Sequence, residues 1–157
     1  FCYFCGDFQD VKCLTSRSYW DFNVEDNAYV ILGNTDGQNA IFHSSATLWK
    51  HTFRLEITLE QGYLEVEGLL SKSGSYGRER LITAKRQFED EAAAVGNPAE
   101  EVTYFDQDLS WELEVEELLR CVDEDTPVTI SSSRDAKRVM EIIDRAYRDA
   151  SNNPEMP

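Results

Sequence analysis

Three features that many proteins use are missing from this sequence. No run of apolar residues reaches the roughly eighteen that a membrane-spanning helix requires. The eight glycines nowhere form the Gly-x-Gly-x-x-Gly turn that holds a dinucleotide phosphate. Basic residues are scarce, with 15 lysines and arginines against 30 aspartates and glutamates, so most of the surface would repel a phosphate backbone. We therefore expect no membrane partner, no nucleic-acid partner and no cofactor-binding residue in this chain.

What is present is typical of one globular domain. The chain has 157 residues, 41% of them hydrophobic and 11% aromatic, which is enough to bury a core and argues against disorder. We predict a single domain over residues 1–157. No secretion signal is visible, so we expect a cytoplasmic protein. The sequence begins at Phe1 without methionine, and apolar residues crowd its first turn as if a helix had been cut. We therefore expect it to be part of a longer protein.

The four cysteines permit a metal-binding interpretation. Cys2 and Cys5 have the spacing of metal ligands, and Cys13 and Cys121 would complete a tetrahedral set. A second Cys-x-x-Cys pair is lacking, however, and a cysteine of a cytosolic protein is usually a small buried hydrophobic residue. We predict no metal site, and we place Cys2 and Cys5 on the packed face of a helix end that Gly6 closes.

Hydrophobic periodicity predicts strands first and helices afterwards. The predicted strands span residues 11–19, 28–32, 39–45, 51–60, 63–69 and 80–86, and the predicted helices span 111–122 and 131–151. A turn at 34–37 makes a hairpin of the second and third strands, and the acidic residues 89–101 are expected to form a solvated excursion. This order indicates an α+β domain, with a predominantly antiparallel open-faced sheet and helices packed on one face.

The strand predicted at 51–60 shows the clearest alternation. Its apolar residues fall on one face and its polar residues on the other. We therefore expect one face to pack on the core and the other to be exposed to solvent or shared with a second subunit. An exposed sheet face is often covered by a second subunit. We expect a homo-oligomer that associates through the sheet face.

The two predicted helices carry different signals. In the first, Glu112, Glu114, Glu116 and Glu117 crowd the early turns; these acids could form a metal-binding cluster, but a solvated face at the positive end of the helix dipole is the more common arrangement. In the second, serines before the first turn and Asp135 within it form an N-terminal capping signature. An apolar stripe on this second helix must pack on another element: Ala136, Val139, Met140, Ile143, Ala146, Tyr147 and Ala150.

Several stretches, in a fixed order, resemble a known protein family. They are Asp21 to Ala28, His43 to Ile57, Gly62 to Leu69, Ser75 to Glu79, and Ser133-x-Asp135-Ala136 with the helix that follows. Together they resemble, over nearly the whole chain, the C-terminal domain of the glucose-fructose oxidoreductase and inositol 2-dehydrogenase (Gfo/Idh/MocA) oxidoreductase family. The resemblance implies a dihydrodipicolinate-reductase-like C-terminal domain that serves substrate binding and oligomerisation.

This resemblance also implies a chemistry. Enzymes of the family move a hydride between a nicotinamide and a hydroxyl-bearing carbon of a sugar or polyol, and the cofactor performs the transfer. NAD or NADP would be bound by an N-terminal Rossmann domain that is absent from this chain. The family's Glu-Lys-Pro lysine and Asp-x-x-x-His histidine would both lie upstream of residue 1. We therefore predict no catalytic residue here and no activity of this chain by itself.

Six residues near predicted loops are candidates for contact with a sugar or polyol substrate: Tyr19, Trp20, Trp49, Lys50, His51 and Tyr76. Lys50 and His51 could hydrogen-bond a hydroxyl while Trp49 offers an apolar floor, and the other three could form the rim. A structural interpretation is also open for each. Trp49 would then belong to the core, Lys50 would be solvated, and His51 would make a local hydrogen bond at the start of a strand. The other aromatic residues would be core or subunit contacts.

The remaining polar candidates favour structural roles. His43 lies within a predicted hairpin strand, and we interpret it as a packed, hydrogen-bonded residue. Glu25 and Asp26 could bind a cation, but adjacent acids in an extended segment point apart, so we predict hydrogen bonding at a turn and strand start. The glycine- and serine-rich loop from Ser71 to Gly77 is expected to help determine the substrate.

The leading hypothesis is therefore the C-terminal domain of a nicotinamide-dependent oxidoreductase, which forms part of the substrate pocket and the subunit interface. The alternative is a stand-alone, non-catalytic binding or oligomerisation module that kept the sheet and lost the chemistry. The fold alone does not separate the two, because function belongs to sites.

Overall fold

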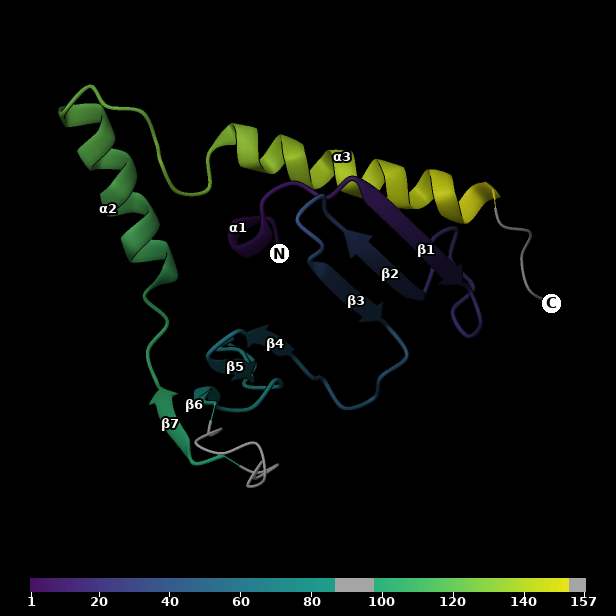
Figure 1. Ribbon diagram of the computed structural model, residues 1–157, viewed down its shortest axis with the longest axis horizontal. Helices are drawn as coiled ribbons and strands as arrows, with labels where there is room; N and C mark the ends of the chain where they lie inside the picture. Colours follow the sequence, from purple (N-terminus) through teal and green to yellow (C-terminus); the bar gives the residue numbers. More distant parts are fainter. Residues whose placement is uncertain (87–97, 153–157) are drawn as a thin grey trace. The chain divides into compact units, whose positions relative to one another are not determined.

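The computed structural model describes residues 1–86 and 98–152, and the chain forms two compact units. The first unit comprises Phe1–Thr47 and the chain from Glu117 onward, and the second comprises Leu48–Glu116. The first holds α1 (Cys2–Cys5), β1 (Asp10–Ser16), β2 (Asn27–Gly33), β3 (Asn39–Ser45) and α3 (Ser133–Asn152) (Figure 1). The second holds β4 (Arg54–Leu59), β5 (Gly62–Glu67), β6 (Glu79–Lys85) and β7 (Glu100–Phe105). Helix α2 (Ser110–Asp123) contains the boundary between the units in the sequence.

The first unit is built on a three-stranded antiparallel sheet in the order β1-β2-β3. Its core consists of five buried residues from the strands, from the segment before β1 and from α3: Phe8, Cys13, Val30, Leu32 and Ala146. Both cysteines of α1 pack against this core, and the Gly6 N–H donates to the Cys2 carbonyl at 3.0 Å, so the predicted helix end is confirmed.

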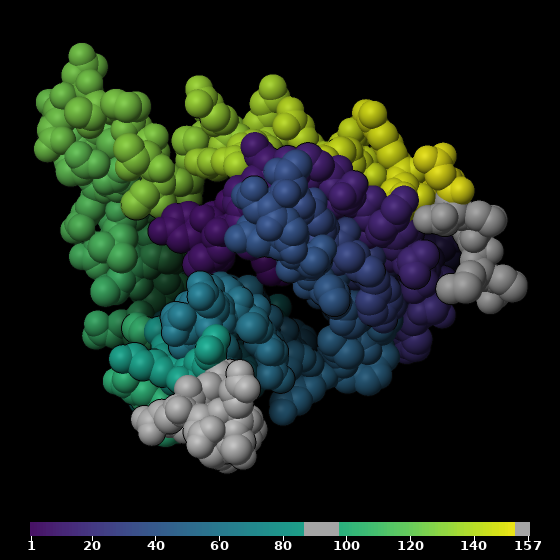
Figure 2. Space-filling model, viewed as in Figure 1, coloured from purple at the N-terminus to yellow at the C-terminus, as the bar shows by residue number. Residues whose placement is uncertain are grey.

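Helix α3 runs beside β1, and in the space-filling view it forms a continuous ridge along this unit (Figures 1 and 2). Its start is capped as predicted, because Ser132 and Asp135 bond reciprocally: the Ser132 N–H donates to the Asp135 carboxylate at 2.9 Å, and the Asp135 N–H donates to the Ser132 hydroxyl at 3.3 Å. The predicted apolar stripe packs only in part. Ala146 and Ala150 contact the core, whereas Met140 is 60% exposed.

One carboxylate fastens α3 to the sheet. Asp149 accepts the backbone N–H of Cys13 at 2.8 Å and pairs with the Lys12 ammonium group at 3.0 Å. Strand β1 is an edge strand, and an unpaired N–H group on such an edge is a template for another chain. The helix therefore supplies the acceptor that no neighbouring strand offers.

The second unit is a four-stranded antiparallel sheet in the order β4-β5-β6-β7. Its register places Leu55 opposite Val66 and Ile57 opposite Leu64, and it places Arg54 opposite Glu67 on the other face. The predicted separation into an apolar and a polar face is confirmed. On the polar face, the Arg80 guanidinium is hydrogen-bonded to Glu67 and lowers the pKa of that carboxyl below its ordinary value.

Two sequence predictions in this part of the chain need correction. Glu100 and Glu101 belong to β7, which pairs with β6, so the end of the predicted excursion is wrong; residues 89–97 of that excursion lie outside the described part of the chain. Helix α2 is present, but its apolar face is not packed, with Trp111 76% exposed and Leu119 57% exposed.

The predicted α+β class and antiparallel pairing are confirmed, with the strands divided between two sheets. Within residues 1–86 and 98–152, no helix has the length and apolar character needed to cross a membrane.

Replacing Asp149 with alanine should lower the free energy of unfolding by about 1–2 kcal/mol, because the buried N–H of Cys13 loses its acceptor. Urea denaturation measures this. The matched control is Asp144→Ala, which removes only an exposed pair with Arg148 and should cost about 0.5 kcal/mol at most. Equal losses in the two variants would contradict the role given to Asp149.

Candidate functional site

The six candidate substrate residues fall into two groups, one in each unit. Tyr19 and Trp20 lie in the first unit, in the connection between β1 and β2. The other four, Trp49, Lys50, His51 and Tyr76, lie in the second unit.

In the second unit, His51 connects the segment before β4 to the loop after β5. Its Nδ1 atom lies 3.1 Å from the Ser75 hydroxyl, and its ring lies 5.3 Å from the Tyr76 ring at an angle of 50°. The structure thus brings together two candidates that are 25 positions apart. The prediction of a local hydrogen bond at His51 is wrong, since its partner belongs to a different loop.

Three serine hydroxyls extend from this histidine in series. The Ser75 Oγ lies 2.7 Å from the Ser73 Oγ, which lies 3.2 Å from the Ser71 Oγ. A hydroxyl both donates and accepts, so the direction of each bond in the series can reverse. All three serines are exposed and can exchange these bonds for bonds to a ligand.

Gly68 closes the base of this loop. Its φ of +76° is in the left-handed region, and a Cβ atom added there would lie 2.4 Å from the Arg78 carbonyl oxygen. The Gly68 N–H donates to the Phe53 carbonyl at 3.1 Å, and the Leu70 N–H donates to Glu79 at 3.1 Å. The two ends of the loop are therefore held by close backbone packing that only glycine permits.

The neighbouring candidates are exposed. Trp49 is 69% exposed, so its interpretation as a core residue is wrong. Lys50 is exposed, and its solvated state is confirmed. Trp49 and Lys50 directly precede His51 in the sequence, and both side chains are accessible to a ligand.

In the first unit, the carboxylate of Asp26 organises the connection that carries Tyr19 and Trp20. It accepts backbone N–H groups from Ser18, Tyr19 and Trp20 at 2.7–3.2 Å. Burial by itself would raise the pKa of Asp26, but these hydrogen bonds outweigh burial and lower it to about 2. The predicted hydrogen bonding at Asp26 is confirmed.

This network also explains why β1 is shorter than predicted. The strand ends at Ser16 and not at Tyr19, because the N–H groups of residues 18–20 turn toward Asp26. The aromatic residues then gather in the connection. The Tyr19 and Trp20 rings meet edge to face at 5.0 Å, and the Trp20 Nε1–H donates to the Ala46 carbonyl at 3.0 Å.

Next to Asp26, the first unit contains a hollow of about 280 Å³ that the sequence did not reveal. Cys13, Phe42 and Ile143 line it, together with Glu25, which accepts the Tyr147 hydroxyl at 2.6 Å. That hydrogen bond raises the pKa of Tyr147, and burial raises the pKa of Cys13. A raised pKa lowers the share of the Cys13 thiol that is present as thiolate, which is the nucleophilic form.

His43 differs from its prediction. Its side chain is exposed and stacks on Tyr29, with ring centroids 4.3 Å apart and planes 8° from parallel. The expectation of a packed, hydrogen-bonded histidine is wrong, because this face of the sheet is uncovered within the unit.

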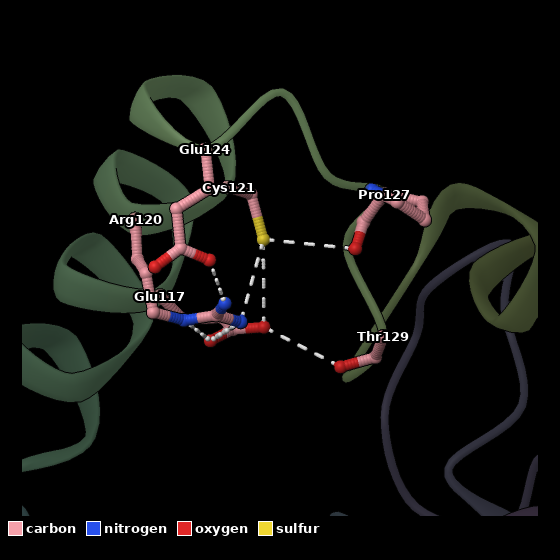
Figure 3. Close-up of polar contacts among 6 residues, drawn as sticks. All are labelled: Glu117, Arg120, Cys121, Glu124, Pro127 and Thr129. Carbon is pink, nitrogen blue, oxygen red and sulfur yellow. Dashed lines mark hydrogen bonds and ion pairs between the residues drawn. The ribbon is translucent and has the colours of Figure 1, made fainter.

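The acids at the end of α2 are engaged by their own neighbours (Figure 3). Arg120 donates to Glu117 at 2.7 Å and to Glu124 at 2.8 Å, and it lowers the pKa of Glu117. The buried Cys121 thiol contacts the Glu117 carboxylate at 3.6 Å and the Pro127 carbonyl at 3.7 Å. These contacts hold the segment that follows α2 against the helix. Within the described ranges 1–86 and 98–152, no group of three or more histidine, cysteine, aspartate or glutamate residues could hold a metal ion.

The α+β fold of this chain is similar to part of the fold of solved oxidoreductases. Three solved structures show the likeness. One is a protein from Desulfitobacterium hafniense DCB-2 assigned as an NADPH-dependent oxidoreductase, with a TM-score of 0.70 and 14% identity over 96% of this chain and 42% of that one. The others are two crystal forms of UDP-N-acetylglucosamine 3-dehydrogenase GnnA from Acidithiobacillus ferrooxidans, with TM-scores of 0.62 and 0.63 and 16% identity.

The GnnA matches cover 90% and 92% of this chain and 39% and 40% of theirs, so the chain spans about two fifths of the length of these enzymes. No family model matches the sequence, and no curated protein does. The structural comparison confirms the predicted fold. The sequence identities are only 14–16%, so the likeness lies in the structure.

The first prediction from the site concerns acid stability. Because the pKa of folded Asp26 is about 2 and that of an unfolded aspartate is about 4, its contribution is complete above pH 4 and is lost as the pH falls toward 2. Asp26→Asn should flatten the fall in unfolding free energy over that interval, as measured by urea denaturation at a series of pH values. Asp21→Asn, in the same connection, is the control and should keep the wild-type slope. A wild-type slope in both variants would refute the assignment.

The second prediction concerns the loop base. Gly68→Ala should destabilise the protein more than Gly74→Ala, because both positions have positive φ but only Gly68 meets backbone atoms. We expect about 1 kcal/mol for Gly74→Ala from backbone strain, and about 1–3 kcal/mol more for Gly68→Ala from the clash. Urea denaturation measures both, and equal effects would show that the close approach at Gly68 is unimportant.

Proposed function

We propose that this chain is the C-terminal domain of a nicotinamide-dependent oxidoreductase of the Gfo/Idh/MocA family that acts on a hydroxyl of a sugar or polyol. The observation that carries the proposal is the structural match over 96% of this chain to an oxidoreductase of which it covers 42%. The order of sequence stretches that resembles the family supports the same conclusion independently. NAD or NADP is bound by an N-terminal Rossmann domain, and the parent enzyme is cytoplasmic.

In this proposal the second unit contributes one wall of the substrate pocket. His51, the serine hydroxyls of the loop and the Tyr76 ring combine hydrogen-bonding groups with an aromatic surface, which suits a polyhydroxylated ring. The hydride transfer and the proton acceptor belong to the rest of the enzyme. GnnA, by its name, acts at a sugar carbon, which is the same class of substrate.

The first unit contributes the subunit interface, with a second copy of this chain as its occupant. The face of the β1-β2-β3 sheet that bears Tyr29 and Ile31 is uncovered and carries a group of adjacent apolar side chains. Leu14, Tyr29, Ile31 and Ile41 on this face are 48–74% exposed, and the strand register places them next to one another. A contiguous apolar sheet face of this kind is typical of a symmetric contact.

Cofactor binding tests the proposal. This chain should show no saturable binding of NADH in a fluorescence titration. The protein encoded by the complete reading frame should bind NADH or NADPH and should carry the Gly-x-Gly-x-x-Gly turn, the Glu-Lys-Pro lysine and the Asp-x-x-x-His helix upstream of Phe1. Saturable binding by this chain alone would overturn the domain assignment. A reading frame that starts at Phe1 would favour the stand-alone module.

A further inference from the structure

We infer that the loop cluster around His51 is a binding site for a phosphate group on the substrate. The cluster comprises Lys50, His51, Lys72, Ser73 and Ser75. The inference rests on the proposed function, because it specifies which sugar derivative the pocket wall recognises: one that carries a phosphate.

Acidic residues are unevenly distributed along the chain. The protein has 30 aspartates and glutamates in 157 residues, yet residues 37–55 contain none and residues 68–78 contain none. These are the two longest acid-free segments in the sequence. In a chain with a formal charge of −15, they are where a bound anion meets the least repulsion.

The structure joins these two segments at one point. His51 belongs to the first and Ser75 and Tyr76 to the second, and the 3.1 Å hydrogen bond and the ring contact hold them together. Two acids lie at the end of the second segment, Glu79 next in the sequence and Asp106 in contact with Arg78, and both already form hydrogen bonds. Asp106 is bound by Arg78 through two hydrogen bonds of 2.6 and 2.7 Å, and Glu79 accepts the Leu70 N–H.

Two lysines provide the positive charge. Lys50 adjoins His51, and Lys72 lies between two serines of the hydroxyl series. Both are exposed. Among the described residues, the lysines that pair with carboxylates are Lys12 and Lys137, and neither Lys50 nor Lys72 is one of them. By contrast, Arg54, Arg78 and Arg80 of the same unit are all paired with carboxylates. The lysines at this loop are therefore available to a ligand.

The groups present match what a phosphate requires. A phosphate oxygen accepts hydrogen bonds from ammonium groups, hydroxyls and imidazole N–H groups, and charged hydrogen bonds are the strongest of these. Ser73 and Ser75 can each turn a hydroxyl proton toward such an oxygen, because each is bonded to a partner that can act as donor or acceptor. A neutral polyol can accept the same hydrogen bonds, but only a phosphate also gains the attraction between its negative charge and the two ammonium groups.

The test uses the two histidines of this chain as reporters, since the sequence contains only His43 and His51. Glucose 6-phosphate, glucose and inorganic phosphate are titrated in turn at constant ionic strength, and the Hε1 resonances are followed by NMR. Glucose 6-phosphate should shift His51 saturably, with a dissociation constant at least about tenfold below that of glucose. Inorganic phosphate should also shift His51. His43, which lies in the other unit, should not move.

A pair of charge-matched variants tests the residue assignment. Lys72→Gln should weaken binding of glucose 6-phosphate by about three- to fivefold, as expected for one exposed charged contact. Lys85→Gln removes the same charge from the opposite end of the sheet, where Lys85 pairs with Gly62, and should leave the affinity unchanged.

The outcomes separate this inference from the proposed function. If glucose and glucose 6-phosphate shift His51 with equal affinity, the phosphate site is refuted and the sugar-binding wall stands. If neither ligand shifts His51, the wall and the phosphate site are both refuted. Equal shifts of His43 and His51, or equal effects of the two lysine variants, would show non-specific attraction of anions and would also refute the site.

Discussion

The first unit depends on one buried carboxylate. Asp26 collects the backbone N–H groups of residues 18–20, its own N–H donates to the Ser16 carbonyl at 3.0 Å, and its carbonyl accepts the Ala46 N–H at 2.7 Å. One residue therefore ends β1, begins β2 and holds the chain that leaves β3. A buried charge is tolerated only when such hydrogen bonds satisfy it, and here the backbone itself provides them.

Much of the fold could be predicted because periodicity is a local signal. Three features each depend on a short stretch of sequence, and all are present: the alternation in β4 and β5, the turn between β2 and β3, and the serine cap of α3. The end of β1 could not be predicted, because it is set by a side chain several positions later. Strand β7 had a local signal in Val102-Thr103-Tyr104-Phe105, but the acids before it concealed that signal.

The candidate site shows the same limit. Its residue types and its two loops were apparent from the sequence, since serine, glycine and histidine beside strand ends are typical of binding sites. The bond between His51 and Ser75 was not apparent, because it depends on how two loops meet at one end of a sheet. The exposed faces of α2 and α3 were also hidden, since a helical pattern states that a face is apolar but not which partner covers it.

The order of the two units along the chain has a consequence for biosynthesis. The second unit, Leu48–Glu116, is inserted between the sheet of the first unit and the helix that completes its core. The Asp149 contact with Cys13 spans 136 positions. On the ribosome, β1 to β3 therefore emerge well before α3, and the edge of β1 and the core around Phe8 stay uncovered until α3 is made. Contacts of such long range slow folding, so the nascent chain has an extended period in which chaperones can bind its open sheet.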